Sequence, residues 1–108
     1  MLYLRICFDK QGGSELRDEL LKAHREYIGS HVGAKKNGVA VVQGGPMCAG
    51  DDVSSKLGSF LVVEADSHKD AQRFNDEDPF TRAGLFDNAR VVRWDRHIGN
   101  PDQTSYVP

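Results

Sequence analysis

The feature that most constrains the fold is the Asp78-Pro79 pair, which lies within the stretch from Lys69 to Trp94. The proline ring crowds the preceding backbone and disfavours the α conformation at Asp78, so a helix that precedes this residue should stop before it. Pro79 can then be the first position of a new helical turn, which Gly84 closes. The stretch therefore predicts a helix, a corner at Asp78, a short helical turn, and a strand over 89–94.

Asp78 admits two interpretations at this corner. Its carboxylate can accept a backbone N–H as the N-cap of the turn that Pro79 opens, which is a purely structural role. A carboxylate held at a rigid corner can also orient a catalytic base. The residues around it leave both interpretations open.

Strands and helices follow one another in the order strand, helix, strand, strand, helix, strand. Runs of β-branched and aromatic residues bounded by turn residues predict the strands, and apolar residues at helical spacing behind capping residues predict the helices. A bend or break is expected near Gly29, because glycine destabilises a helix interior. The predicted elements are a strand over 2–8, a helix with Ser14 as its N-cap, a strand over 39–43 ended by Gly44-Gly45-Pro46, a loop over 47–58, a strand over 59–65, a helix from Ser67 to about residue 75, and a strand over 89–94.

This order is that of the ferredoxin-like split βαβ sandwich, an α+β fold in which helices cover one face of an antiparallel four-stranded sheet. The predicted strands carry apolar residues on both sides, so the second face of the sheet also needs cover. Dimerisation through the two sheets is the simplest way to supply it. The sequence therefore predicts a homodimer with the form of a dimeric α+β barrel.

Length, charge and cysteine usage limit the classes of function. A chain of 108 residues with a net charge of -2 is predicted to form one domain over 1–95 and a polar tail over 96–108. The lack of a basic stripe, of an apolar run near the roughly 20 residues that span a bilayer, and of a signal peptide predicts a cytoplasmic protein with neither nucleic acid nor membrane as partner. Cys7 and Cys48 form no CxxC pair and no histidine motif gathers ligands, so we expect no metal site.

Two histidines are predicted to face inward from the first helix. His24 stands four residues after Leu20 and four before Ile28, and His31 follows one heptad later. Either imidazole can be a partly buried group bonded to the backbone, which is a structural role. An imidazole beside a carboxylate can instead transfer protons near neutral pH.

Gly44 and Gly45 allow the backbone to bend or to approach a ligand closely. They belong to no phosphate-binding signature, because neither GxGxxG nor GxxxxGKS/T can be written through them. No nucleotide or other cofactor is therefore predicted.

Several short motifs, each weak alone, occur together in this chain: Ala23-His24, Gly44-Gly45-Pro46-Met47, Asp78-Pro79-Phe80, Ala83-Gly84-Leu85-Phe86 and Val92-x-Trp94. Together they resemble the YciI-like (YCII-related) family of small proteins. The resemblance runs from Met1 to about Trp94, and it implies a dimeric ferredoxin-like fold with a His–Asp dyad at His24 and Asp78. The family includes a dehydrochlorinase that acts on a chlorinated hydroxyhydroquinone, so the resemblance also implies a lyase-type elimination.

The predicted function is that of a small acid–base enzyme without a cofactor, acting on a hydroxylated aromatic compound or a related small metabolite. His24 is its predicted base or proton shuttle, and Asp78 is predicted to fix the imidazole tautomer and stabilise its protonated form. The alternative is a non-catalytic module of the same fold that binds a small aromatic metabolite or a partner protein, with Asp78 only as a cap. The residues predicted to bind the substrate are Gly44, Gly45, Pro46, Met47, Tyr27, Phe80 and Arg82.

Overall fold

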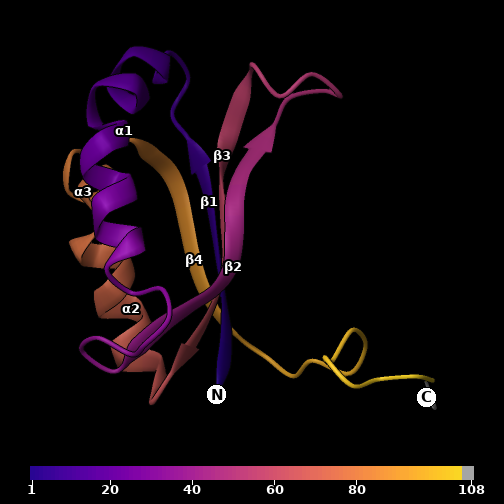
Figure 1. Ribbon diagram of the computed structural model, residues 1–108. Helices are drawn as coiled ribbons and strands as arrows, with labels where there is room; N and C mark the ends of the chain where they lie inside the picture. Colours follow the sequence, from indigo (N-terminus) through magenta and orange to yellow (C-terminus); the bar gives the residue numbers. More distant parts are fainter. Residues whose placement is uncertain (106–108) are drawn as a thin grey trace.

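The protein is described here by a computed structural model over residues 1–105. Within these residues, four strands form one sheet, and three helices lie together against one of its faces (Figure 1). The elements are β1 (Leu2–Asp9), α1 (Ser14–Gly29), β2 (Val39–Cys48), β3 (Lys56–Ala65), α2 (His68–Glu77), α3 (Pro79–Arg82) and β4 (Phe86–Trp94).

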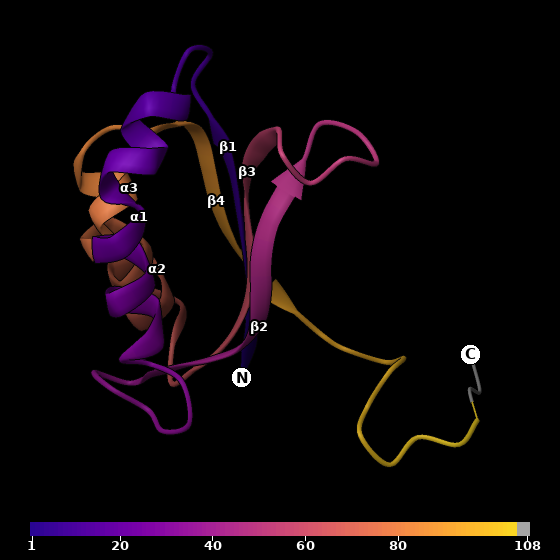
Figure 2. The ribbon, with the colours of Figure 1, turned by 45° about the horizontal axis from the view of Figure 1, so that its top comes forward.

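The sheet has the strand order β2-β3-β1-β4, and each neighbouring pair is antiparallel. This is the strand arrangement of the ferredoxin-like split βαβ fold, so the predicted fold class is confirmed. After a turn of the view, the helices still lie on one side of the sheet and its second face stays open (Figure 2). No helix within residues 1–105 is both long and apolar enough to cross a bilayer.

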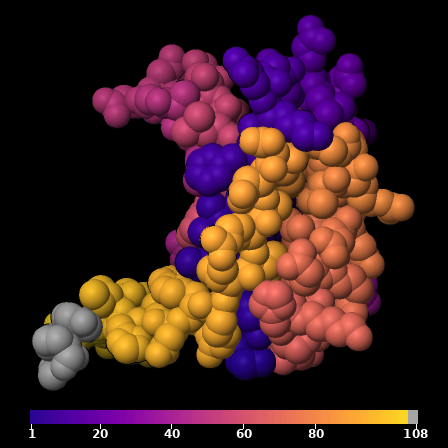
Figure 3. Space-filling model, turned by 180° about the vertical axis from the view of Figure 1, so that it is seen from behind, coloured from indigo at the N-terminus to yellow at the C-terminus, as the bar shows by residue number. Residues whose placement is uncertain are grey.

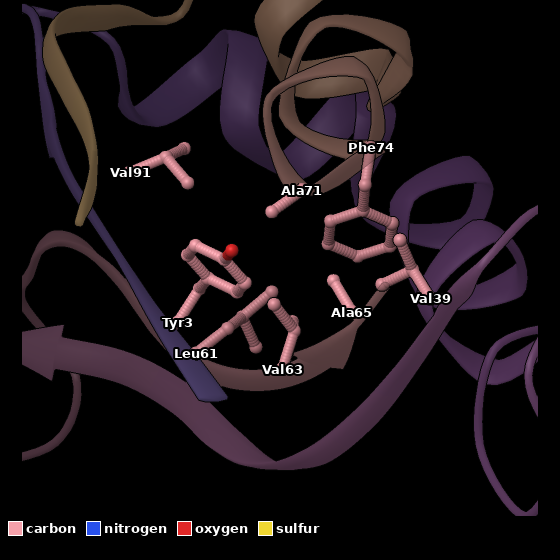
Figure 4. Close-up of a cluster of buried hydrophobic side chains, with 8 residues drawn as sticks. All are labelled: Tyr3, Val39, Leu61, Val63, Ala65, Ala71, Phe74 and Val91. Atoms are coloured by element: carbon pink, nitrogen blue, oxygen red, sulfur yellow. The ribbon is translucent and has the colours of Figure 1, made fainter. Parts of the chain in front are cut away.

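The core fills the space between the sheet and α2. Aromatic and branched side chains from the strands meet Ala71 and Phe74 of the helix (Figure 4). Burial of one such large side chain stabilises the fold by about 1.5–3 kcal/mol before the entropy cost of ordering it. The cluster comprises Tyr3, Val39, Leu61, Val63, Ala65, Ala71, Phe74 and Val91.

Alternation along β1 separates the two faces of the sheet, because successive side chains point to opposite sides. Tyr3, Arg5 and Cys7 face the helices and are buried, whereas Leu4 and Ile6 face the open side and are half-buried. Figure 3 shows this open side as a hollow between the projecting β2–β3 hairpin and the segment 95–105. Dimerisation through the open side remains a prediction, and residues 106–108 of the predicted tail lie outside the described residues.

The glycine pair does not end the second strand, contrary to the sequence prediction. Strand β2 continues through Gly44 and Gly45 to Cys48, and β3 already begins at Lys56, so the loop between them is shorter than 47–58. A Cβ atom on Gly44 would lie only 2.7 Å from the carbonyl oxygen of Phe60. Glycine is therefore needed here for close pairing of the two strands, not for chain reversal.

The helix ends agree with the sequence except at one position. Ser14 is the first helical residue rather than the N-cap, which is Gly13 and makes no side-chain capping bond. Helix α1 ends at Gly29, where a bend or break was expected. At the start of α2 the Ser67 side chain accepts the N–H of Asp70, as a capping residue should.

The predicted corner is present at Asp78. Helix α2 stops at Glu77, and the carboxylate of Asp78 caps α3 by accepting the N–H of Phe80 at 2.9 Å. Gly84 follows α3 with a φ of 76°, a left-handed conformation that glycine adopts without steric cost. The corner brings Asp78 over the buried face of β1, where Arg5 lies.

Candidate active site

A cleft of about 870 Å³ lies between α1 and the β2–β3 side of the sheet. One face of α1 forms a wall of the cleft, since its lining residues recur every three or four positions. The turn before α1 and the two strands complete the lining. The lining residues of α1 that share this spacing are Ser14, Arg17, Leu21, His24 and Ile28.

His24 lies where this cleft meets the Asp78 corner. Its Nδ1 atom is 2.9 Å from Oδ1 of Asp78, and its ring stacks on Phe80 with centroids 3.9 Å apart and planes 9° apart. The side chain is 13% exposed, and no group within residues 1–105 forms a hydrogen bond with Nε2. The expected proximity of His24 and Asp78 is confirmed.

Asp78 is completely buried and accepts three hydrogen bonds from groups within residues 1–105. Besides His24 and the N–H of Phe80, Nη1 of Arg5 donates to Oδ2 at 2.7 Å. Burial alone would raise the pKa of Asp78, but the hydrogen bond from His24 and the charge of Arg5 outweigh it and hold that pKa below its ordinary value. The carboxylate is therefore ionised at neutral pH.

An ionised Asp78 determines the tautomer of His24. A carboxylate can only accept hydrogen bonds, so Nδ1 of His24 must carry the proton in the pair. In the neutral imidazole the free electron pair is then on Nε2, which belongs to a side chain that lines the cleft. The arrangement suits a general base that Asp78 holds in one tautomer.

Arg5 is a site residue that the sequence reasoning missed. Its guanidinium is 1% exposed, Nε donates to Sγ of Cys7 at 3.2 Å, and Nη2 has no hydrogen-bond partner in the described part of the chain. The guanidinium carbon lies 5.4 Å from the centroid of Phe86, which offers a cation–π contact instead. A signal was available, because Arg5 is the one charged residue between Leu2 and Phe8 and shares its face with buried residues.

Arg17 and Asp9 form a second buried ion pair, at the cleft wall, which was also missed. Nε of Arg17 donates to Oδ2 of Asp9 at 2.7 Å, and Nη2 donates to Oδ1 of Asp9 at 2.8 Å and to Oγ of Ser59 at 3.1 Å. The guanidinium carbon lies 4.8 Å from the centroid of Phe80. Arg17 and His24 thus both contact this one aromatic ring.

Three of the residues predicted to bind substrate do line the cleft, namely Gly44, Gly45 and Pro46. Met47, the next residue of β2, does not. Strand β2 continues through these four residues, whereas the sequence prediction ended the strand before Gly44 and placed Met47 in a loop.

Tyr27, Phe80 and Arg82 are likewise absent from the cleft wall. The hydroxyl of Tyr27 donates to the carbonyl of Phe74 at 2.7 Å, and burial raises the pKa of this phenol. Phe80 is fully buried and supports the ring of His24 from below, while Arg82 is exposed in the last turn of α3. Their side chains pack in the interior or face the solvent. The spacing of these residues along the chain could not distinguish such roles from ligand binding.

His31 follows the structural interpretation. It lies just after α1, is 3% exposed, and packs edge-on against Phe74. Its Nδ1 is 3.0 Å from the carbonyl oxygen of Tyr27. Within residues 1–105, no group of three or more His, Cys, Asp or Glu side chains is arranged to hold a metal ion.

Comparison with known proteins agrees with this fold. The model of the YCII-related domain matches residues 1–95. The chain belongs to the YCII-related family. The resemblance drawn from the motifs is thus confirmed.

One solved YCII-type structure is similar over almost the whole YCII-related chain. It is 5-chloro-2-hydroxyhydroquinone dehydrochlorinase from Burkholderia phenoliruptrix, in complex with 2,5-dihydroxybenzoquinone. The two sequences are 35% identical, the TM-score is 0.74, and the match covers 88% of this chain and 94% of that chain. No match is found among curated protein sequences.

Proposed function

We propose that this protein is a small acid–base enzyme that eliminates hydrogen chloride, or a similar leaving group, from a hydroxylated ring. The observation that carries the proposal is the buried, ionised Asp78, which bonds Nδ1 of His24 at 2.9 Å, while Nε2 bonds no group of residues 1–105 and belongs to a side chain that lines a cleft. His24 is the base and Asp78 its orienting residue. Proton transfer by a positioned group of this kind contributes roughly 10²–10⁴ in rate.

The chemistry needs only proton transfers. On a chlorinated hydroxyhydroquinone, neutral His24 takes a hydroxyl proton and returns it to the carbon that bears chlorine, which becomes tetrahedral. It then takes a proton from a second hydroxyl group, and the electron pair of that O–H bond moves through the ring. Chloride leaves with the electron pair of the C–Cl bond. The products are a hydroxyquinone and hydrogen chloride, so no oxidant takes part.

The solved relative supports this substrate class. By its name it removes hydrogen chloride from 5-chloro-2-hydroxyhydroquinone, and its structure holds 2,5-dihydroxybenzoquinone, a hydroxylated six-membered ring. The cleft of about 870 Å³ between α1 and the sheet exceeds the volume of such a ring. We infer a substrate of the same kind, with its reacting edge at His24.

A binding module of the same fold is the alternative function. It is favoured by the capping bond from the N–H of Phe80 to Asp78 and by the need of buried Arg5 for a counter-charge, both of which would retain Asp78 without any catalysis. Neither feature needs the contact with His24. The role of His24 therefore separates the two functions.

The test is chloride release from 5-chloro-2-hydroxyhydroquinone by the wild type, by His24→Gln, and by His97→Gln as control. His24→Gln leaves Asp78 bonded to Arg5 and to the N–H of Phe80, so the fold should persist. His97 is exposed beyond the sheet, and within residues 1–105 its ring pairs with Asp95 alone. We expect a loss of roughly 10²–10⁴ in kcat for His24→Gln and none for the control. Equal rates for all three proteins would refute the role of His24.

A further inference from the structure

The guanidinium of Arg17 has an unused donor at the cleft. Its side chain is 7% exposed, and its Nε and Nη2 atoms are both occupied by Asp9 and Ser59. Nη1 forms no hydrogen bond within residues 1–105, and Arg17 is part of the cleft lining. A guanidinium has five N–H donors, so the two on Nη1 remain free for a ligand.

Ser59 supplies a second donor at the same place. Its hydroxyl oxygen accepts from Nη2 of Arg17 at 3.1 Å, and its own O–H finds no acceptor among the residues that the structure describes. The residue is 4% exposed and also lines the cleft. Two buried side chains thus offer unpaired donors next to each other on the wall of a cleft, which is the arrangement that binds an oxygen anion.

The charges around the cleft suit a negatively charged ligand. The chain as a whole has a net charge of -2. Among residues 1–105, four cationic side chains and two acidic ones line the cleft, and the acidic Asp9 is already paired with Arg17. The cationic residues are Lys10, Arg17, Arg25 and Lys56, and the acidic residues are Asp9 and Asp18.

We propose that Arg17 and Ser59 bind an ionised ring oxygen of the ligand, so that the substrate class is an acidic hydroxyquinone or a hydroxylated aromatic ring that is an anion at neutral pH. This rests on the proposed function, because it uses the same cleft as the substrate site. Nη1 of Arg17 donates a charge-assisted hydrogen bond to the oxygen, and the hydroxyl of Ser59 donates a second one.

The position of Arg17 relative to His24 indicates how the contact with the ligand oxygen orients the substrate. Arg17 and His24 lie two turns apart on α1, and both contact the ring of Phe80. An oxygen anchored at Arg17 therefore holds a small ring in the cleft with its opposite edge toward His24. Arg17 and Ser59 position the substrate and select its anionic form, while His24 acts on the reacting edge.

The test compares two ligands of one ring type. The first is 2,5-dihydroxybenzoquinone, whose hydroxyl groups ionise at neutral pH, and the second is 2,5-dimethoxybenzoquinone, which has no ionisable hydroxyl. Binding is measured by calorimetry for the wild type, Ser59→Ala, Arg17→Lys, and Arg82→Lys as control. Arg82 is exposed on α3 and lies outside the cleft lining. Lysine has no planar fork, so at position 17 it cannot hold Asp9 and a ligand in the same way.

We expect Ser59→Ala and Arg17→Lys each to raise the Kd of the dihydroxy ligand about tenfold or more, and to change that of the dimethoxy ligand less than about threefold. The control should change neither. An unchanged Kd for the dihydroxy ligand in Ser59→Ala and Arg17→Lys would overturn the proposal, and so would an equal loss for both ligands. If Arg17→Lys does not fold, Ser59→Ala decides alone.

The same proteins separate this inference from the proposed elimination. A wild type that releases no chloride from 5-chloro-2-hydroxyhydroquinone, yet binds the dihydroxy ligand through Arg17 and Ser59, would refute the elimination and support the anion subsite. A wild type that releases chloride at a rate dependent on His24, with ligand binding indifferent to Arg17 and Ser59, would overturn the subsite alone.

Discussion

Replacement of Asp78 by Asn should destabilise the protein strongly, although both residues cap helices about equally well. The reason is Arg5. Its guanidinium is 1% exposed and has Asp78 as its buried counter-charge at 2.7 Å. Asn is neutral, and its amide group can present N–H donors to the donors of Arg5, so the variant leaves a buried cation without compensation.

The magnitude follows from the burial of both partners. Removal of one member of a buried, hydrogen-bonded ion pair costs about 3–5 kcal/mol, because the remaining charge stays desolvated. A domain of this size has a total stability of about 5–15 kcal/mol, so Asp78→Asn should consume a large part of it. A pure cap exchange would cost a few tenths of a kcal/mol.

Urea unfolding followed by circular dichroism, at one fixed protein concentration, measures the loss. With a slope of about 1–3 kcal/mol per molar urea, the midpoint of Asp78→Asn should fall by at least about 1 M. The urea midpoint of Arg5→Met should fall by a similar amount, since this substitution leaves Asp78 without its cation. The double variant Arg5→Met/Asp78→Asn should lose less unfolding free energy than the sum of the two single losses. The difference, which is the coupling energy of the two residues, should be about 1–3 kcal/mol.

A loss below about 1 kcal/mol for Asp78→Asn, or additive losses in the double variant, would refute this reasoning. Either result would mean that Arg5 does not depend on Asp78 for compensation. The Arg5–Asp78 contact would then contribute nothing to the free energy of unfolding, and the role of Asp78 would be limited to orienting His24.

The remaining predictions concern pH, strand pairing and assembly. The folded-state pKa of Asp78 is lowered below its ordinary 3.8, so its ionised form stabilises the protein above pH 3.8, and this benefit is lost as the pH falls through the folded value. In acid unfolding, the difference in unfolding free energy between wild type and Asp78→Asn should therefore shrink below pH 3.8. In urea unfolding, Gly44→Ala should lower the unfolding free energy by about 1–3 kcal/mol, because its Cβ would meet the carbonyl oxygen of Phe60. Gly45→Ala has open space around its Cβ and should change the unfolding free energy by less than about 1 kcal/mol. Equal losses in the two variants would contradict the packing argument. Sedimentation should show a dimer at micromolar concentration, and Ile6→Asp on the open face should convert it to a monomer; a monomeric wild type would exclude pairing through the sheets.

The order of the elements and the corner at Asp78 could be predicted from the amino-acid sequence alone. These features depend on local physics, since Pro79 stops a helix and alternating or helical spacing of apolar residues needs no distant partner to be recognised. Family motifs added the link between His24 and Asp78, and the 2.9 Å contact between them confirms that the two meet. Local patterns were sufficient for these points because each is written within one short stretch.

Which side chains share an environment became clear from the packing of the chain in three dimensions. Arg5 and Asp78 are 73 positions apart, and the pattern of β1 showed which face Arg5 occupies but not what it meets there. The sequence predicted that Gly44 ends a strand, yet the strand continues, and the neighbouring strand β3 leaves no room for a side chain at this position. Contacts of this kind arise from how the sheet and the helices pack against each other, and a one-dimensional pattern carries spacing along the chain but no distances between its distant parts.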